Sequence, residues 1–245
     1  MLHRIKQQLI REHKIKKYLL YAAGEIILVV IGILIALKIN NMNLGAQNRT
    51  LAYQNLAEIK ADLQLNAIQI EDYILFLEDR CNRKRILLKH QTYDTFNLDS
   101  LVSLVQPLYD MVEINARAYN KAINDNIPNL EAHANVYNDI STYYTTVKNK
   151  FDTYLNFERD LTIKEAEYWY YNPDVELMYL HEDFPFINSE QEQKSYLINQ
   201  ISTVSGNNRL RANLYRKHHT LKAIKVIQTK TRTLIEAIDK TLKTD

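Results

Sequence analysis

The feature that most constrains this chain is a hydrophobic segment close to its N-terminus. From Tyr18 to Ile39 the sequence reads YLLYAAGEIILVVIGILIALKI, and its strictly apolar part runs from Ile26 to Leu37. As an α-helix these 22 residues extend about 33 Å, which is enough to cross a hydrocarbon core of about 30 Å. A buried core helix or a cleaved secretory signal can contain a similar run. However, no A-x-A-like cleavage site follows, and the segment is long for a signal. We therefore expect a transmembrane helix over residues 18–39.

Basic residues lie mainly on one side of this segment. The first 17 residues hold six Lys or Arg, whereas only Lys38 and Arg49 lie close behind the segment. Because the cytoplasmic flanks of membrane helices are enriched in Lys and Arg, residues 1–17 are predicted to form a basic cytoplasmic tail and the bulk of the chain to lie outside the cytoplasm. A basic tail that leads directly into an apolar segment favours a membrane surface over nucleic acid. We expect the lipid bilayer as a partner and no nucleic acid.

One face of the predicted span combines small residues with a carboxyl group. At 100° per residue, Glu25, Val29, Gly32 and Ala36 fall within a sector of about 60°. Gly and Ala four residues apart let two helices approach closely, and a protonated carboxyl can hydrogen-bond across the contact. These four residues are our candidates for packing against another membrane helix. The alternative is that Glu25 reaches the inner headgroups and that the small residues have no special role.

The rest of the chain is predicted to be helical, because the whole sequence contains only four Gly and four Pro. A polar connector at residues 40–46, with Gly45 as a helix interruption, should lead into a long helix over about 47–89. Its apolar residues recur in steps of three and four, the spacing of helices that pair along their length. Asn66 falls on this seam and could fix the register. The full seam is Leu56, Ile59, Leu63, Asn66, Ile70, Tyr73 and Leu77.

The C-terminal region repeats the pattern over about 190–243. Ser189 and Glu192 form a capping box at its start, and an interruption is expected near Gly206. The two long helices could pack antiparallel within one chain, or each could pair with a second copy, and the sequence leaves both open. The C-terminal seam consists of Leu210, Leu214, Lys217, Leu221, Ile224, Gln228, Thr231, Ile235, Ile238 and Leu242.

Between the long helices, residues 94–189 are predicted to form a small head. Shorter helices are expected at about 98–108, 113–125 and 129–168, with Asn97 or Asp99 as the first cap and boundaries at Pro107 and Pro128. A segment containing Pro173 and Pro185 has no helical period and should be an ordered aromatic loop. The predicted fold is therefore all-α: one transmembrane helix, a long-helix stalk within an extracytoplasmic domain at 47–245, and a helical head.

The sequence offers no clear chemistry. Cys81 is the only cysteine, which excludes an intramolecular disulfide, and although basic neighbours could lower its thiol pKa, an unreactive helix cysteine is the simpler interpretation. Side chains of the adjacent His218 and His219 point about 100° apart on a helix, which does not suit one metal ion. His181, Glu182 and Asp183 lack a further ligand at metal spacing. We expect no catalytic residue, no cofactor, no metal and no enzyme activity.

Aromatic residues are concentrated in the predicted head. They could line a groove for a ligand or partner, but packing in the core of the head is the simpler interpretation. The cluster consists of Tyr143, Tyr144, Phe151, Tyr154, Phe157, Tyr168, Trp169, Tyr170 and Tyr171.

The stretch GEIILVVIGILIALKINNMN, residues 24–43, preceded by KIKKYLLYA, resembles a family of uncharacterised single-span proteins common in Bacteroidota. That family shows a G-E-I-x-L-V-V-x-G-I-x-I-A pattern before an asparagine-rich boundary, and it often has Trp where Met42 stands here. Residues 118–144 and 207–228 are similar to its central and final helices. The matching membrane positions are Gly24, Glu25, Ile26, Leu28, Val29, Val30, Gly32, Ile33, Ile35, Ala36, Asn40 and Asn41.

The resemblance implies a bacterial inner-membrane protein with a periplasmic helical domain, and it transfers no active site. Together with the long seams, it favours a non-catalytic helical scaffold or accessory subunit that binds other membrane or envelope proteins or associates with itself. The alternative is a periplasmic ligand-sensing domain. Because a tail of about 17 residues is too short for a kinase or DNA-binding module, such a sensor would signal through a partner subunit.

Overall fold

The structure, a computed structural model, describes residues 2–90, 92–171, 176 and 186–244, with backbone only for residues 2–15, 17, 18, 21 and 244. Over these ranges the regular structure is helical and contains no strand, which confirms the all-α prediction. The chain divides into two compact units, residues 1–53 and 54–245. The aromatic loop expected around Pro173 and Pro185, including His181, Glu182 and Asp183, lies outside the described residues.

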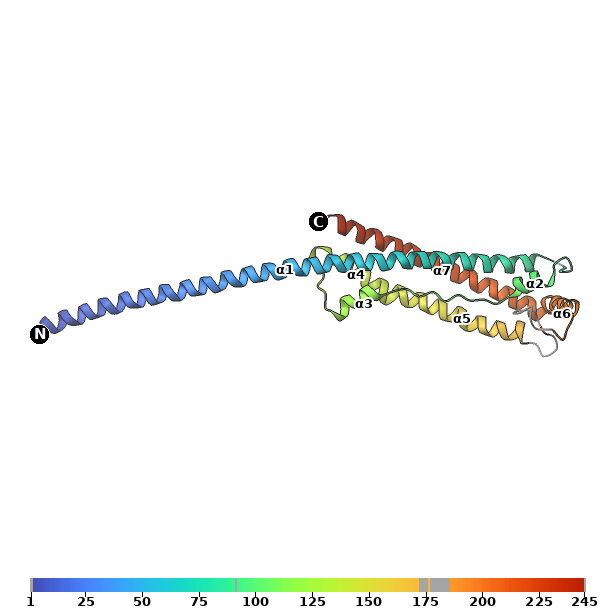
Figure 1. The fold of residues 1–245 in the computed structure, drawn as a ribbon, viewed down its shortest axis with the longest axis horizontal. Helices are drawn as coiled ribbons and strands as arrows, with labels where there is room; N and C mark the ends of the chain where they lie inside the picture. Colours follow the sequence, from blue (N-terminus) through green and yellow to red (C-terminus); the bar gives the residue numbers. More distant parts are fainter. Residues whose placement is uncertain (1, 91, 172–175, 177–185, 245) are drawn as a thin grey trace. The chain divides into compact units, whose positions relative to one another are not determined.

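The first unit is one helix. It is the N-terminal part of α1, which runs from Leu2 to Lys89 (Figure 1). The predicted interruption at residues 40–46 is wrong, because the helix continues through Gly45. A helical Gly costs only about 1 kcal/mol relative to Ala, and well-formed turns on both sides make propagation through it cheaper than starting a new helix.

The second unit contains the rest of α1 and the remaining helices. Two of these helices begin at N-cap residues that the sequence predicted. Asn97 accepts a hydrogen bond from Ser100 N at the start of α2, and Ser189 with Glu192 forms the capping box of α6. Helix α2 ends just before Pro107, because a proline disfavours helical backbone in the residue that precedes it. The elements are α2 (Leu98–Val105), α3 (Arg117–Asn124), η1 (Glu131–His133), α4 (Ala134–Thr142), η2 (Tyr143–Val147), α5 (Lys148–Tyr170), α6 (Glu190–Ser202) and α7 (Val204–Thr244).

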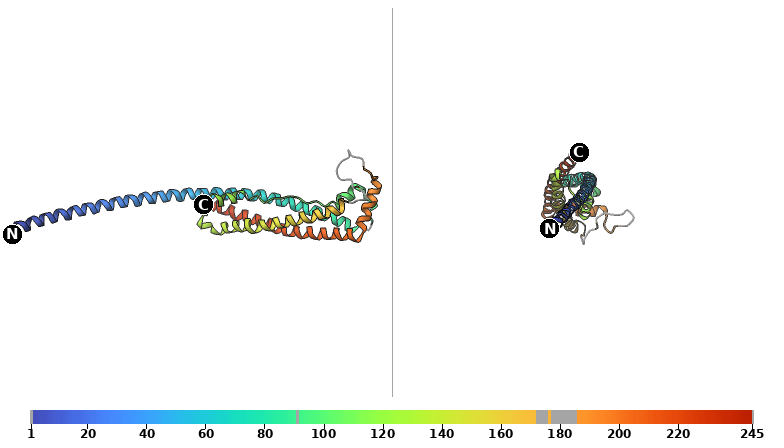
Figure 2. Two further views of the ribbon diagram at one scale, coloured as in Figure 1. Left: turned by 90° about the horizontal axis from the view of Figure 1, so that it is seen from below. Right: turned by 90° about the vertical axis from the view of Figure 1, so that its left-hand side faces the viewer.

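The two predicted seams meet within one chain. Going along α1, Lys60 pairs with Asp239, Glu71 with Arg232 at 2.6 Å, and Glu78 with Lys225 at 2.6 Å. Positions in α7 therefore fall as positions in α1 rise, so the helices are antiparallel. Figure 2 shows the same arrangement from two further sides.

The region predicted as a head does not stand apart from the long helices. Helices α4 and α5 are joined through η2, a single π-helical stretch, and they lie along α1 and α7 as a third long helix. Large apolar residues on this segment explain the difference, because Ile140, Tyr143, Val147 and Phe151 share one face and are buried. Helices α2 and α6 pack against each other at the end of the bundle where α1 ends and α7 begins.

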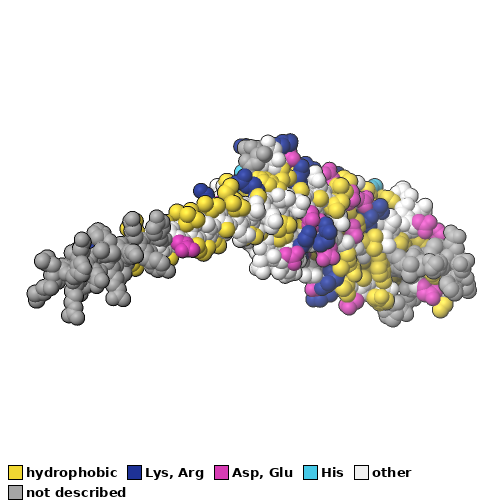
Figure 3. All heavy atoms as spheres, turned by 60° about the vertical axis from the view of Figure 1, so that its left-hand side comes forward, with side chains coloured by type: hydrophobic (Ala, Val, Ile, Leu, Met, Phe, Trp, Pro, Cys, Tyr) yellow, Lys and Arg dark blue, Asp and Glu magenta, His cyan; other side chains and the backbone are white. Residues whose placement is uncertain are grey.

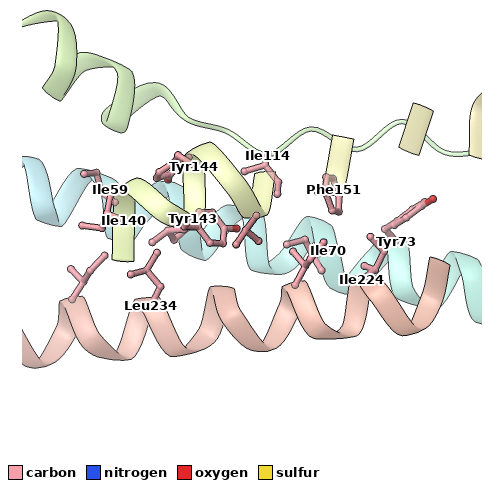
Figure 4. Close-up of a cluster of buried hydrophobic side chains, with 14 of the residues drawn as sticks. Ile59, Ile70, Tyr73, Ile114, Ile140, Tyr143, Tyr144, Phe151, Ile224 and Leu234 are labelled. Atoms are coloured by element: carbon pink, nitrogen blue, oxygen red, sulfur yellow. The ribbon is translucent and has the colours of Figure 1, made fainter. Parts of the chain in front are cut away.

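Two apolar clusters hold the second unit together. The larger lies between α1, α7 and the α4–η2–α5 segment, and Figure 4 shows Ile70, Tyr143, Phe151 and Ile224 pointing into it from three helices. The smaller lies around Trp169 where α2, α5 and α6 meet. These clusters account for much of the predicted aromatic group: Tyr143, Tyr144, Phe151 and Trp169 are core residues, whereas Tyr154, Phe157 and Tyr171 are exposed.

The predicted interruption of the C-terminal helix is a sharp break at Thr203, between α6 and α7. The two helices approach so closely here that a Cβ atom on Gly206 would stand 2.0 Å from the carbonyl oxygen of Gln200. Thr203 Oγ1 accepts a hydrogen bond from Gly206 N at 3.0 Å. Glycine is therefore required at this position by the close approach of two backbones.

Candidate functional site

The first candidate site is the apolar part of α1 within the first unit. Between Ala23 and Thr50 every side chain is exposed, and no residue of the most apolar 18-residue window is buried. Figure 3 shows hydrophobic side chains on this stretch of helix. Exposing so many large apolar groups to water is unfavourable, by about 25 cal/mol for each Å². This N-terminal helix is long and apolar enough to span a membrane.

The four predicted packing residues lie within this exposed stretch. Glu25, Val29, Gly32 and Ala36 are all in α1, whose turn places them along one face. A Cβ atom added to Gly32 would meet nothing within 4 Å. Space for a close-packed second helix is therefore open at this face.

The second candidate site is a set of polar side chains buried in the bundle. Three of them, on α1, hold the chain where it enters α3. The Asn66 side chain donates to the backbone carbonyl oxygen of Asn115 at 3.0 Å and accepts from the backbone N–H of Asn115 at 2.8 Å. The Asp62 carboxylate accepts from Ala118 N at 2.8 Å and so caps α3, which has no cap of its own. Asn55 donates to the carbonyl oxygen of Ala118 at 3.1 Å.

Two buried lysines donate hydrogen bonds to backbone carbonyls in the last turn of α2 and on the segment that follows it. Lys84 Nζ donates to the carbonyl oxygens of Leu104 at 2.6 Å and Val105 at 2.7 Å, at the end of α2. Removal of its ammonium from water lowers the pKa of Lys84 to about 7. Lys217 on α7 donates to the carbonyl oxygen of Leu108 at 3.2 Å. A segment without a strand partner thereby obtains the hydrogen bonds that its buried backbone needs.

Lys217 also belongs to a buried ion-pair network between α5 and α7. Its ammonium lies 3.1 Å from Glu158 Oε2, and both side chains are almost fully buried. Arg216 bridges the two carboxylates of α5, at 3.2 Å from Glu158 and 2.8 Å from Glu165. Thr220 donates to Glu158 at 3.1 Å, and Asn213 donates to Glu165. The charges in this network are engaged with one another and with the backbone.

Two of the other sequence candidates, Cys81 and His219, lie among the described residues in ordinary packing positions. Cys81 is fully buried, and burial raises the pKa of its thiol despite its basic neighbours. His219 contacts the ring of Tyr215 at a centroid distance of 4.8 Å. Among the described residues, no group of three His, Cys, Asp or Glu side chains could hold a metal ion.

Sequence reasoning identified Asn66 and Lys217 as polar seam residues but missed four other buried polar groups: Asp62, Lys84, Glu158 and Glu165. The signal for the last two was present, since Phe151, Glu158, Thr162, Glu165 and Trp169 recur in steps of seven, four, three and four on one helix face. A carboxylate on such a face is a candidate for a buried ion pair.

Comparison with known proteins bears on the first half of the chain. Residues 25–118 match a family of unknown function, DUF6090. No curated protein and no solved structure matches the chain.

The DUF6090 match begins at Glu25 and ends at Ala118. It therefore includes the candidate packing face of the apolar helix, the rest of α1, α2, and the residues at the entry of α3 that Asn55, Asp62 and Asn66 hold. The expected match to a family of unknown function is thus found for this stretch, while the bacterial group and the membrane motif of the resemblance stay predictions. Segments 119–144 and 207–228, which carried the remaining resemblance, lie outside the match.

Proposed function

We propose that this protein is a non-catalytic helical scaffold or accessory subunit, anchored in a bacterial inner membrane by residues 18–39. The tail at 1–17 lies in the cytoplasm and the bulk of the chain in the periplasm. The main support is the combination of a fully exposed apolar helix with a bundle whose buried charges are consumed in structural contacts. Such a protein acts through what its surfaces bind.

The partner within the membrane is a second helix that packs on Glu25, Val29, Gly32 and Ala36. Small residues at this face let the two backbones approach closely, and the Glu25 carboxyl supplies a hydrogen bond across the contact. Unlike the bundle, this face has no partner in its own unit.

The test is chemical crosslinking in native membranes, followed by affinity purification of the full-length protein and mass spectrometry. Wild type is compared with Glu25→Ala and Gly32→Leu, and Leu34→Ala on the opposite face of the helix is the matched control. The proposal predicts a reproducible partner or self-adduct that either site variant weakens and the control does not. Recovery of the lone polypeptide from every sample would contradict it.

A groove favours the alternative function of a periplasmic ligand sensor. It lies between α1, α3 and α4, has a volume of about 430 Å³, and is lined by Tyr119, Tyr137 and Asn55 among others. Aromatic rings with a few amides suit a small polar ligand. A panel of small ligands that raises the melting temperature of wild type but not of Tyr119→Ala would support this alternative, and an unchanged melting temperature across the panel would count against it.

A further inference from the structure

The outer face of α1 in the second unit carries an apolar stripe. Leu65, Ile68 and Leu75 are more than half exposed, and their spacing places them on one side of the helix, opposite the buried seam. Asp72 and Asp79 lie on the same side, before and after Leu75, and Asp79 pairs with Arg80 at 2.6 Å and with Arg83 at 2.8 Å on its own helix. The stripe is therefore apolar, with Asp72 as the acidic group open to a partner.

The outer face of α7 has the opposite charge. Val226 is 56% exposed, and Lys222 and Lys230 stand four residues before and after it on the exposed surface. Tyr215 continues the face toward the start of the helix. Residues 193–235 contain no Asp or Glu. This stripe is apolar with basic flanks.

The antiparallel pairing of α1 and α7 sets the two stripes at matching heights. Glu78 pairs with Lys225 and Glu71 with Arg232, so Leu75 is within about one turn of the level of Val226. By the same alignment Asp72 is level with Lys230, and Asp79 with Lys222. Within the described part of the chain, neither Asp72 nor Lys230 has an ion-pair partner.

We infer that a second copy of this chain docks on these stripes, with the outer face of α1 in one copy packed against the outer face of α7 in the other. This rests on the proposed function, which brings copies together in one bilayer, and the docked copies lie side by side with their α1 helices parallel. In that orientation α1 of one copy is antiparallel to α7 of its neighbour. Leu75 then meets Val226, while Asp72 meets Lys230. Complementary charge at matched height selects a second copy as the occupant.

The test is disulfide crosslinking between two differently tagged full-length copies in membranes, one carrying Leu75→Cys and the other Val226→Cys. The native Cys81 is fully buried and stays in both copies. In the matched control, the second copy carries Ile163→Cys, which is exposed on α5 away from both stripes. We expect a disulfide-linked pair with Val226→Cys and about fivefold less with the control, the level of chance collision.

Charge exchange tests the alignment. Adding Asp72→Lys to the first copy should lower the yield of the linked pair about fivefold, and adding Lys230→Asp to the second copy should restore it. A yield no higher than in the Ile163→Cys control, or a yield indifferent to both charge changes, would overturn the inference. Should the native-membrane crosslinking above still capture a different protein through Glu25 or Gly32, the accessory role stands and only self-docking fails. If the chain is absent from membranes, the proposed function fails first.

Discussion

At the scale of single residues, Gly206 shows how closely α6 and α7 approach. Alanine normally stabilises a helix by about 1 kcal/mol relative to glycine, but an alanine Cβ at position 206 would stand 2.0 Å from a backbone oxygen. Gly206→Ala should therefore lower the free energy of unfolding by about 1–3 kcal/mol, the usual cost of overpacking. Thermal melting of the full-length protein, followed by circular dichroism, measures the change.

Gly45→Ala is the matched control, because this glycine is also helical and a Cβ there meets nothing within 4 Å. Its melting temperature should equal or exceed that of wild type. If Gly206→Ala melted as Gly45→Ala does, the close contact between α6 and α7 would be wrong.

Lys84 gives the bundle a pH dependence. Its pKa is lowered from 10.5 to about 7 in the folded protein, so between these values the unfolded chain binds more protons than the folded one. The free energy of unfolding should therefore rise as pH increases from 7 to 9, by about 2 kcal/mol, and this contribution should be absent below pH 7. Burial also raises the pKa of Tyr144, which acts in the opposite sense only at higher pH.

Urea unfolding at several pH values, compared between wild type and Lys84→Met, isolates this effect. The variant should lose the rise between pH 7 and 9. Parallel curves for the two proteins would show that Lys84 keeps an ordinary pKa in the fold.

At the scale of helices, the pairing of α5 with α7 depends on the buried ion pair between Glu158 and Lys217. Lys217→Leu should leave the carboxylate without its closest partner in a dry environment, at a cost of about 3–5 kcal/mol. Lys225→Leu, on the same helix, removes an exposed pair with Glu78 and should cost under about 1 kcal/mol. Chemical unfolding of both variants measures the difference, and equal effects would contradict a buried network.

The helices themselves follow from the sequence, because their seams, caps and prolines are local signals. Asn97, Ser189 with Glu192, and the break near Gly206 were all predictable in this way. Gly45 was misread, since one glycine is a weak interruption inside a strong helix. What Asn66 binds was out of reach, because its partner Asn115 is distant in sequence and precedes α3, whereas the sequence predicted a helix from about residue 113.

At the scale of the whole molecule, the sequence predicted the fold class and the antiparallel option but drew the head as a separate part. Periodicity shows that residues 134–170 have an apolar face, and it does not show which helices cover that face. The candidate packing face of Glu25, Val29, Gly32 and Ala36 could be predicted from residue spacing alone, since it depends only on helix geometry. The buried ion-pair network between α5 and α7 could not be predicted, because it depends on which helices pack together.

The membrane topology of the full-length protein directly tests the proposal of a single-span anchor with the bundle outside the cytoplasm. Lys16→Cys lies before the apolar segment and Val204→Cys, at a residue 79% exposed, lies in the second unit. In intact spheroplasts, a membrane-impermeant maleimide should label Val204→Cys and leave Lys16→Cys unlabelled until the membrane is permeabilised. Equal labelling of both positions in intact spheroplasts, or recovery of the protein in the soluble fraction, would contradict a single-span anchor with its bundle outside the cytoplasm.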